Sequence, residues 1–157
     1  MNQQDITLAI QSALGSLDER DTNLLSFGVN ERSITHKLAN YLQNLFPDYD
    51  VDCEYNRLGS EGVVKKIYQL GNHNPQSAPI DDVNAITVFP DIIIHKRGET
   101  DSEYNLLVIE AKKFGLNTDF DRMKLDSYKH ELHYQFAALI VFPEHQKRFT
   151  DSLISFV

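Results

Sequence analysis

Two apolar stretches in the second half of the chain have the length and composition of buried strands. The first runs from Ile86 to His95 (ITVFPDIIIH) and the second from Asn105 to Lys113 (NLLVIEAKK). A polar segment, residues 96–103, separates them. Both stretches are short, rich in β-branched residues and bounded by charged residues or glycine, which is typical of core strands. The pattern therefore predicts two adjacent buried strands joined by a turn.

Ahead of these strands, apolar residues at helical spacing predict two helices. Residues 3–17 carry one apolar stripe, and Gly15 is a candidate end for that helix. A second helix is predicted from Glu31 to about Phe46, with Asn30 as its N-cap. Glu31 lies outside the apolar stripe of this helix, in the first turn, where a negative charge interacts favourably with the helix dipole. On its position alone, Glu31 is an ordinary first-turn glutamate.

The same rules of periodicity predict the remaining elements. In chain order they are a half-exposed strand over residues 50–57, a hairpin extension over 62–68, a surface loop over 70–82, a helix over 118–133, a strand over 135–142 and a terminal helix over 144–157. The helix over 118–133 takes its predicted apolar face from Phe120, Met123, Tyr128 and Leu132. A chain of 157 residues is expected to form one domain. The prediction is a mixed α/β (α+β) fold whose central mixed sheet is flanked by helices.

Both predicted core strands carry ionisable residues where an apolar strand should have none. These are Asp91 in the first strand, and Glu110 and Lys112 in the second. Burying such groups is costly unless they pair with one another or hold a metal ion. Because successive strand residues point to opposite faces, Glu110 and Lys112 share a face, and the neighbouring strand can bring Asp91 alongside Glu110. A functional site and a buried network of ion pairs both fit this pattern.

The pattern Pro90-Asp91 followed by Glu110-Ala111-Lys112 resembles the signature of the PD-(D/E)xK nuclease superfamily. The resemblance covers residues 30–142 in outline, and the predicted order of helix, three strands, helix and strand is similar to the αβββαβ core of the restriction-endonuclease-like fold. It implies one domain over residues 1–157. In that domain residues 1–29 are a helical extension, residues 30–142 are the core and residues 143–157 are a C-terminal helix.

The resemblance also implies an activity, namely metal-dependent hydrolysis of nucleic-acid phosphodiester bonds with Mg²⁺ or Mn²⁺ as cofactor. Asp91, Glu110 and the backbone carbonyl of Ala111 would supply oxygen ligands, which these ions prefer. Glu31 would add a further ligand, because members of the superfamily often carry an acidic residue on the first core helix. Lys112 would orient the attacking water or stabilise charge that develops in the transition state.

Charge changes the expected substrate affinity. The formal net charge is −8, which counts against a generic nucleic-acid binder because phosphate binding relies on Lys and Arg. Basic residues nevertheless gather near the motif, and the expected nucleic-acid contacts are Lys65, Lys66, Lys96, Arg97 and Lys113. DNA is expected more than RNA, with a homodimer or a partner subunit completing the enzyme. The alternatives are a non-catalytic nucleic-acid- or protein-binding regulatory module on the same fold, and a structural interaction protein with a chance motif.

Other site types lack their sequence patterns. His130, Glu131 and His133 do not have the spacing of a His-Glu-x-x-His zinc site, and no glycine-rich phosphate loop is present. Cys53 is the only cysteine, which excludes an intramolecular disulfide and favours a reducing compartment. The first residues lack the features of a signal peptide, and no apolar run approaches the roughly 20 residues that span a bilayer. We therefore expect a cytoplasmic protein with no membrane partner.

Overall fold

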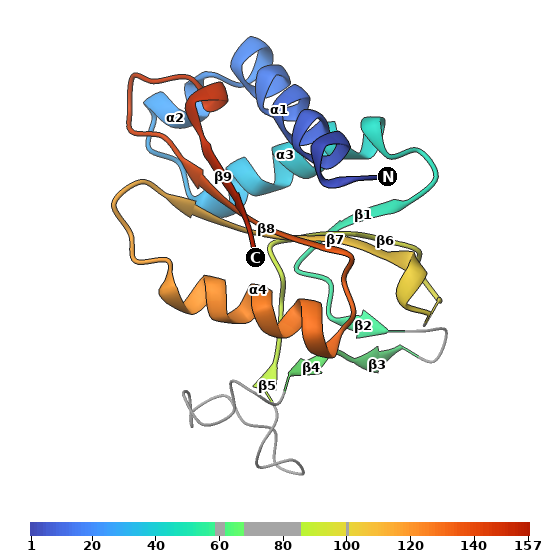
Figure 1. The fold of residues 1–157 in the computed structure, drawn as a ribbon. Coiled ribbons are helices and arrows are strands. Elements are labelled where there is room, and N and C mark those ends of the chain that lie inside the picture. The colour runs from blue at the N-terminus through green and yellow to red at the C-terminus, as the bar shows by residue number, and fades with distance from the viewer. Residues whose placement is uncertain (59–61, 68–85, 100) are drawn as a thin grey trace.

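The protein has a mixed α+β fold in which a five-stranded sheet lies between helices (Figure 1). The structure is a computed structural model that describes residues 1–58, 62–67, 86–99 and 101–157. Helices α1 and α3 cover one face of the sheet and α4 covers the other. The predicted fold class is confirmed to this extent: a central mixed sheet is flanked by helices.

The helices and strands follow one another in the predicted order of helix, strand, strand, strand, helix and strand across the core. Their bounds are α1 Gln3–Arg20, α2 Asn23–Ser26, α3 Glu31–Leu45, β1 Asp50–Cys53, β2 Arg57–Leu58, β3 Val63–Val64, β4 Lys66–Ile67, β5 Ile86–Thr87, β6 Ile92–His95, η1 Ser102–Tyr104, β7 Asn105–Lys113, α4 Asp119–Glu131, β8 Phe136–Phe142, η2 Phe149–Asp151 and β9 Leu153–Phe156. The short strands β2 to β5 add to this core as two small pairs, β2 with β3 and β4 with β5.

The five-stranded sheet is mixed because one of its neighbouring strand pairs is parallel. The strand order is β1-β6-β7-β8-β9, with β7 and β8 parallel and the other neighbours antiparallel. Parallel neighbours need a crossover connection, and α4 provides it between β7 and β8. In this strand order, β7 is the middle strand of the sheet.

Residues of β7 alternate between two apolar cores. Leu107, Ile109 and Ala111 pack into the core that includes α1 and α3, whereas Val108 packs into the core that includes α4. Residues two apart on a strand share a face, so Glu110 lies on the α4 side with Val108. A charged residue is thus built into the apolar face of the central strand.

The start of α3 is confirmed as predicted, and the end of α1 is not. The side chain of Asn30 accepts a hydrogen bond from the backbone N–H of Arg32 at 3.0 Å, so Asn30 caps the helix. Helix α1 continues through Gly15 to Arg20. It does so because Leu17, which is fully buried, carries the apolar stripe one turn further.

The predicted strand from Ile86 to His95 is divided in two. β5 pairs with β4 in a small sheet, whereas β6 joins the central sheet. Pro90 lies between them, has no N–H to donate, and accepts a hydrogen bond from the backbone N–H of Glu54 at 3.0 Å. The break places Asp91 immediately before β6, at the end of the sheet.

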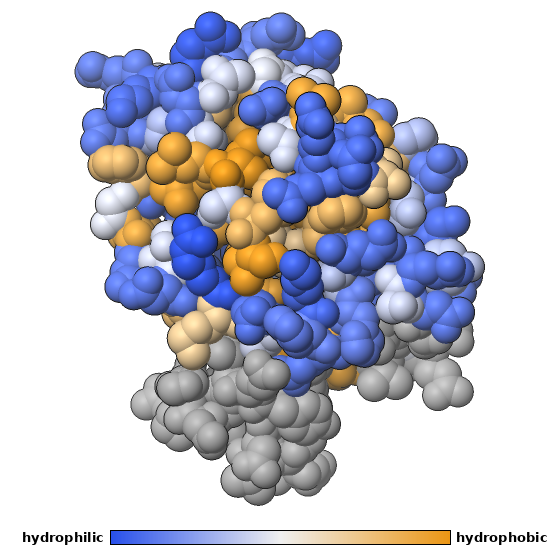
Figure 2. Space-filling model, in the orientation of Figure 1, coloured by the Kyte–Doolittle hydropathy of each residue, from blue (hydrophilic) through white to orange (hydrophobic). Residues whose placement is uncertain are grey.

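The predicted C-terminal helix is wrong. A single 3-10 turn, η2, is followed by β9, which pairs antiparallel with β8. The open edge of β8 has backbone groups that a further strand satisfies, and the sequence Leu-Ile-Ser-Phe suits a strand. Leu153 of β9 is 66% exposed, and Figure 2 shows apolar surface gathered in the region of β9, between α1 and α4.

Two further expectations concern loops and membranes. The predicted strand over residues 50–57 is divided: β1 joins the central sheet, and β2 pairs with β3 in a short hairpin. The predicted loop over residues 70–82 lies outside the described residues. Among the helices that the structure describes, none combines the length and the apolar character needed to cross a bilayer.

Candidate active site

Asp91 and Glu110 face each other at one end of the central sheet. The β6–β7 register pairs Ile92 with Ile109, so the next position along each strand brings Asp91 opposite Glu110. Oδ2 of Asp91 accepts a hydrogen bond from the backbone N–H of Ala111 at 2.8 Å. The structure therefore brings together the two carboxylates that the sequence motif predicted.

Glu110 is enclosed by donors from α4. Its side chain is 1% exposed, with Oε1 accepting a hydrogen bond from the hydroxyl of Tyr128 at 3.1 Å and Oε2 lying 2.5 Å from Nζ of Lys124. Burial raises the pKa of Glu110 to about 8, and the nearby Lys124 ammonium opposes that rise. Burial and the neighbouring Glu110 carboxylate raise the pKa of Tyr128 well above its usual range.

Two residues of this cluster, Asp121 and Lys124, were missed by sequence reasoning. Nζ of Lys124 lies 3.1 Å from Oδ1 of Asp121, whose side chain is 4% exposed. The apolar residues predicted to form the buried face of α4 include Phe120 and Met123, which are 43% and 40% exposed. The buried face includes Tyr128, as predicted, together with Asp121, which was not predicted to be buried. The helical spacing of residues 121, 124 and 128 places them on one face of α4, and this spacing was the sequence signal that could have grouped them.

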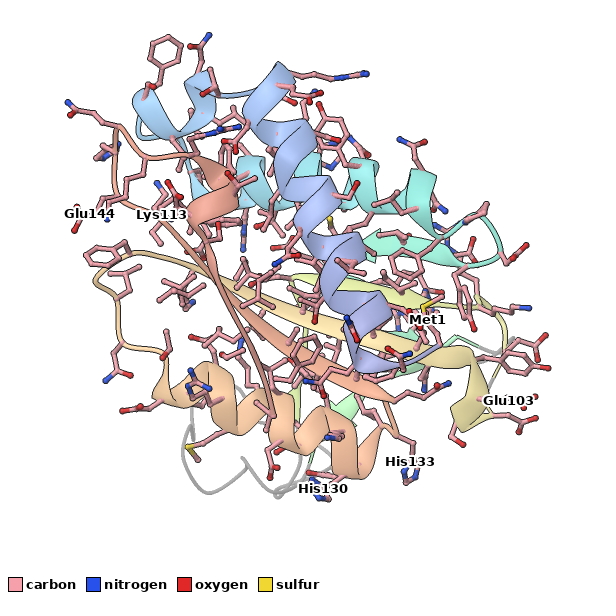
Figure 3. The ribbon with its side chains drawn as sticks, turned by 45° about the horizontal axis from the view of Figure 1, so that its top comes forward. Met1, Glu103, Lys113, His130, His133 and Glu144 are labelled. Atoms are coloured by element: carbon pink, nitrogen blue, oxygen red, sulfur yellow. The ribbon has the colours of Figure 1, made fainter. Side chains whose placement is uncertain are left out.

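Lys112 connects this cluster to the start of α3. Its Nζ lies 3.5 Å from Oδ2 of Asp121 and 3.9 Å from Oε1 of Glu31. Oε2 of Glu31 accepts a hydrogen bond from the backbone N–H of Lys113 at 2.9 Å. The four predicted side chains therefore lie around the C-terminal end of β7. They are Glu31, Asp91, Glu110 and Lys112. In Figure 3 the label of Lys113 marks this end of β7, and Glu103 lies near the opposite end.

The cluster carries more negative than positive charge. Among the described side chains in it, four carboxylates (Glu31, Asp91, Glu110 and Asp121) meet two ammonium groups (Lys112 and Lys124). Two negative charges are left over if all six groups are ionised. Burial raises the pKa of Asp91, while the Ala111 N–H and the two lysines oppose the rise. A divalent cation has the charge needed to balance the cluster.

The donor chemistry also fits such a cation. Carboxylate oxygens are hard ligands that suit Mg²⁺ and Mn²⁺, and Asp91 and Glu110 are adjacent. Across the described ranges, no three His, Cys, Asp or Glu side chains are arranged closely enough to hold an ion as they stand. Asp91 and Glu110 would therefore need waters or a backbone carbonyl to complete the coordination shell, and Ala111 is the predicted source of that carbonyl.

The cluster opens onto solvent through a hollow of about 500 Å³. Its lining residues are Asn30, Glu31, Arg32, Glu54, Phe89, Asp91 and Lys112. Glu110 lies beneath this lining because it is almost completely buried. A substrate in the hollow would thus meet Asp91, Lys112 and Glu31 directly, with Glu110 behind them.

Two of the predicted nucleic-acid contacts are turned toward the protein itself. Lys65 is 1% exposed, and its Nζ donates a hydrogen bond to the hydroxyl of Tyr134 at 2.7 Å. The prediction for Lys65 needs correction, because a buried ammonium group does not reach an external phosphate. Nζ of Lys113 donates to the backbone carbonyl of Val29. The side chain of Lys66 lies outside the described part of the structure.

The other two predicted contacts, the half-buried Lys96 and the exposed Arg97, already have partners. Nζ of Lys96 lies over the ring of Tyr104, 5.3 Å from its centroid. Arg97 pairs with Asp52 and lies 3.6 Å from Asp50. Both residues belong to the turn between β6 and β7, at the end of the sheet opposite the carboxylate cluster.

Comparison of the chain with known protein families, with curated proteins and with solved structures found no match. The functional assignment consequently rests on the residues and their geometry.

Proposed function

We propose that the chain is a metal-dependent nuclease that hydrolyses phosphodiester bonds, with DNA as the first substrate to test, and that its core has the restriction-endonuclease-like arrangement. The observation that carries the proposal is the placement of Asp91 opposite Glu110 with Lys112 nearby, at the base of an open hollow. Structural ion pairs alone do not need a solvent-filled hollow above them.

Asp91 and Glu110 would hold the cation, and Glu31 and the carbonyl of Ala111 are the further candidate ligands. When bound, Mg²⁺ or Mn²⁺ polarises the scissile phosphate and makes a bound water more acidic. Burial raises the pKa values of Asp91 and Glu110, and a bound cation would favour their ionised forms. The cluster would then have two negative charges for the cation to balance.

The chain's own residues have separate tasks in this proposal. Lys112 is 26% exposed and lines the hollow, so its ammonium is placed to orient the attacking water and to stabilise charge that develops on the phosphate. Glu31 and Asp121 hold Lys112 from opposite sides of the sheet end. Lys124 and Tyr128 fix both oxygens of Glu110 in place. Water would attack the phosphorus in line with the leaving oxygen as the bond between phosphorus and that oxygen breaks. The water would lose a proton to solvent, and the leaving oxygen would take one up to become the hydroxyl end of one nucleic-acid fragment.

A second candidate function is a non-catalytic binding module on the same fold. It is favoured by the hydrogen bonds that already engage both oxygens of Glu110 and one oxygen of Asp91. The net charge of −8 also favours it. In this alternative the cluster is a buried ion network, and the hollow binds a partner without cutting it.

A cleavage assay separates the two candidates. Labelled single-stranded, duplex and branched DNA and RNA are incubated with Mg²⁺ or Mn²⁺, and parallel samples contain EDTA. Wild type is compared with Asp91→Asn and Lys112→Ala. The matched control is Asp101→Asn, because Asp101 is exposed in the turn at the other end of β6 and β7.

The nuclease proposal predicts metal-dependent cutting that falls by about 100- to 1,000-fold in the Lys112 variant, as when one charge-stabilising group is lost. The Asp91 variant should lose cutting to a similar or greater degree, and Asp101→Asn should keep it. Absence of cutting together with absence of metal binding by calorimetry would leave the binding module as the better assignment.

A further inference from the structure

Phe89 has an exposed aromatic ring on the wall of the candidate site. Its side chain is 55% exposed and lines the same hollow as Asp91 and Lys112. An isolated exposed apolar residue is common on protein surfaces and needs no explanation. This ring differs because the other side chains around the hollow are polar or charged, namely Asn30, Glu31, Arg32, Glu54, Asp91 and Lys112.

The backbone fixes the position of the ring relative to the proposed chemistry. Burial alternates from Val88 to Asp91, with Val88 and Pro90 buried and Phe89 exposed. Phe89 and Asp91 both line the hollow, so the ring and the carboxylate border the same space. The adjacent Pro90 has a fixed φ angle, which limits the movement of the segment.

The charges around the hollow do not provide a strong phosphate-binding surface. The net charge is −8, and Lys65, Lys96, Arg97 and Lys113 all have partners within the chain. Lys112 and Arg32 line the hollow, and Arg32 is paired through Nε with Glu54 at 2.9 Å. As far as the described side chains go, affinity for a nucleic acid needs contacts that do not depend on charge.

Base stacking on an aromatic ring is a contact of that kind. Each base offers a flat face, and stacking on one ring contributes enough to change affinity by roughly 5- to 150-fold. In a duplex both faces of a base are covered by its neighbours, so a ring of the protein stacks only on a base that is unpaired. The volume of the hollow, about 500 Å³, lies within the range of about 300–1,000 Å³ that ligand sites have.

We infer that Phe89 is the stacking platform for an unpaired base beside the cleaved bond, and that the site acts on single-stranded nucleic acid. This inference rests on the proposed nuclease function. It gives Phe89 the role of a specificity residue, which contacts the substrate without taking part in proton or metal chemistry. Arg32, with its 79% exposed side chain on the same wall, is placed to contact the strand beside that base.

The experiment measures binding and cutting of the same labelled oligonucleotide as a single strand and as a duplex, in DNA and in RNA form. Binding is measured by fluorescence anisotropy in Ca²⁺ for wild type, Phe89→Ala, Phe89→Leu and Phe89→Tyr. The leucine variant keeps apolar bulk without a ring face, and the tyrosine variant keeps the ring. Thermal melting checks that each variant is folded. We expect all three to fold, because Phe89 is exposed and its ring contributes little to the core.

Wild type should bind and cut the single strand better than the duplex. Phe89→Ala should lose roughly 5- to 150-fold of single-strand affinity, Phe89→Leu should lose part of it, and Phe89→Tyr should keep it. The salt dependence of binding should stay the same in Phe89→Ala, because no phosphate contact is removed. Cutting of the duplex should be unchanged by these substitutions.

Two outcomes overturn the inference and are distinguishable from failure of the nuclease proposal. If wild type cuts but prefers the duplex, or if Phe89→Ala cuts the single strand as wild type does, stacking by Phe89 is refuted and the nuclease stands. If the single strand binds in a Phe89-dependent way but no substrate is cut, the stacking platform stands and the nuclease proposal fails. If no oligonucleotide binds, both are refuted.

Discussion

Nζ of Lys124 lies 2.5 Å from Oε2 of Glu110, joining α4 to the central strand of the sheet through an ion pair. The side chains of Glu110 and Lys124 are 1% and 18% exposed. Asp121 on α4 shares the same ammonium at 3.1 Å. Because both side chains are largely buried, this ion pair is part of the packing of α4 on the sheet, whereas an exposed pair would contribute little.

Replacement of Lys124 by methionine should destabilise the fold strongly. The variant removes the ammonium partner of the buried Glu110 and leaves Asp121 with Lys112 alone. Breaking a buried pair in this way costs about 3–5 kcal/mol. Urea unfolding measures the change. Lys129→Met is the control, because Lys129 is exposed on the same helix and its hydrogen bond to the Val157 carbonyl, 2.7 Å long, is also exposed. This variant should stay within about 0.5 kcal/mol of wild type. Equal effects at the two positions would contradict this account.

The double variant Glu110→Gln with Lys124→Met should cost less than the sum of the two single changes. Once Glu110 is neutral, loss of the ammonium no longer leaves a charge unpaired beside Tyr128. A coupling free energy of about 1–3 kcal/mol is expected from a double-mutant cycle in urea. Additive single effects would show that the two side chains act on stability independently.

Divalent cations should stabilise the folded chain if the cluster binds them. At a free Mn²⁺ or Mg²⁺ concentration about 100 times the dissociation constant, the free energy of unfolding should rise by about 2.7 kcal/mol. The rise appears as a higher melting temperature that EDTA reverses. Asp91→Asn should abolish the rise and Asp101→Asn should keep it. A melting temperature that does not respond to either ion in the wild type would count against the metal site.

Substitution of Glu31 should test whether the start of α3 belongs to the site. Glu31→Gln removes the charge that faces Lys112 while keeping an oxygen for the Lys113 N–H. Cutting should fall by about 10- to 100-fold, as when a residue that orients a metal site is changed. Glu54→Gln is the matched control, since Glu54 lines the same hollow but pairs with Arg32. Similar losses of cutting in both variants would show that Glu31 contributes no more than another glutamate of the hollow.

Lys65 should make stability depend on pH in the alkaline range. Burial lowers the pKa of Lys65 from its ordinary 10.5 to about 8, so between these values the unfolded chain binds more protons than the folded chain. Stability from this group therefore rises with pH, by about 2 kcal/mol between pH 8 and pH 10. The stability difference between wild type and Lys65→Met isolates this contribution from that of Cys53, whose pKa burial raises to about 11. A difference that is constant with pH would contradict it.

Local patterns predicted the strands of the core better than the ends of the chain. β6, β7 and β8 were found because each is an apolar run with β-branched residues, and such runs have few alternatives to burial. The last residues were assigned to a helix from the spacing of Phe149, Leu153 and Phe156. They form β9 because the open edge of β8 offers hydrogen bonds, which is a tertiary effect that periodicity does not contain.

For the candidate site, the motif located Asp91, Glu110 and Lys112 and missed the residues of α4. Asp91, Glu110 and Lys112 were visible because charge in an apolar run is anomalous. Asp121 and Lys124 lie in a helix with many polar residues, where charge is ordinary, so only the structure distinguishes the pair that turns inward. Their functional roles remain predictions for the assays above.

The hydrogen bond between Glu31 and the Lys113 N–H joins residues 82 positions apart in sequence. Closing so long a loop is entropically unfavourable until the intervening sheet is in place, so this contact belongs among the late events of folding. During synthesis, a nascent chain that ends before α4 has neither Asp121 nor Lys124 to complete the cluster. The cluster is therefore incomplete until α4, Asp119–Glu131, has been synthesised.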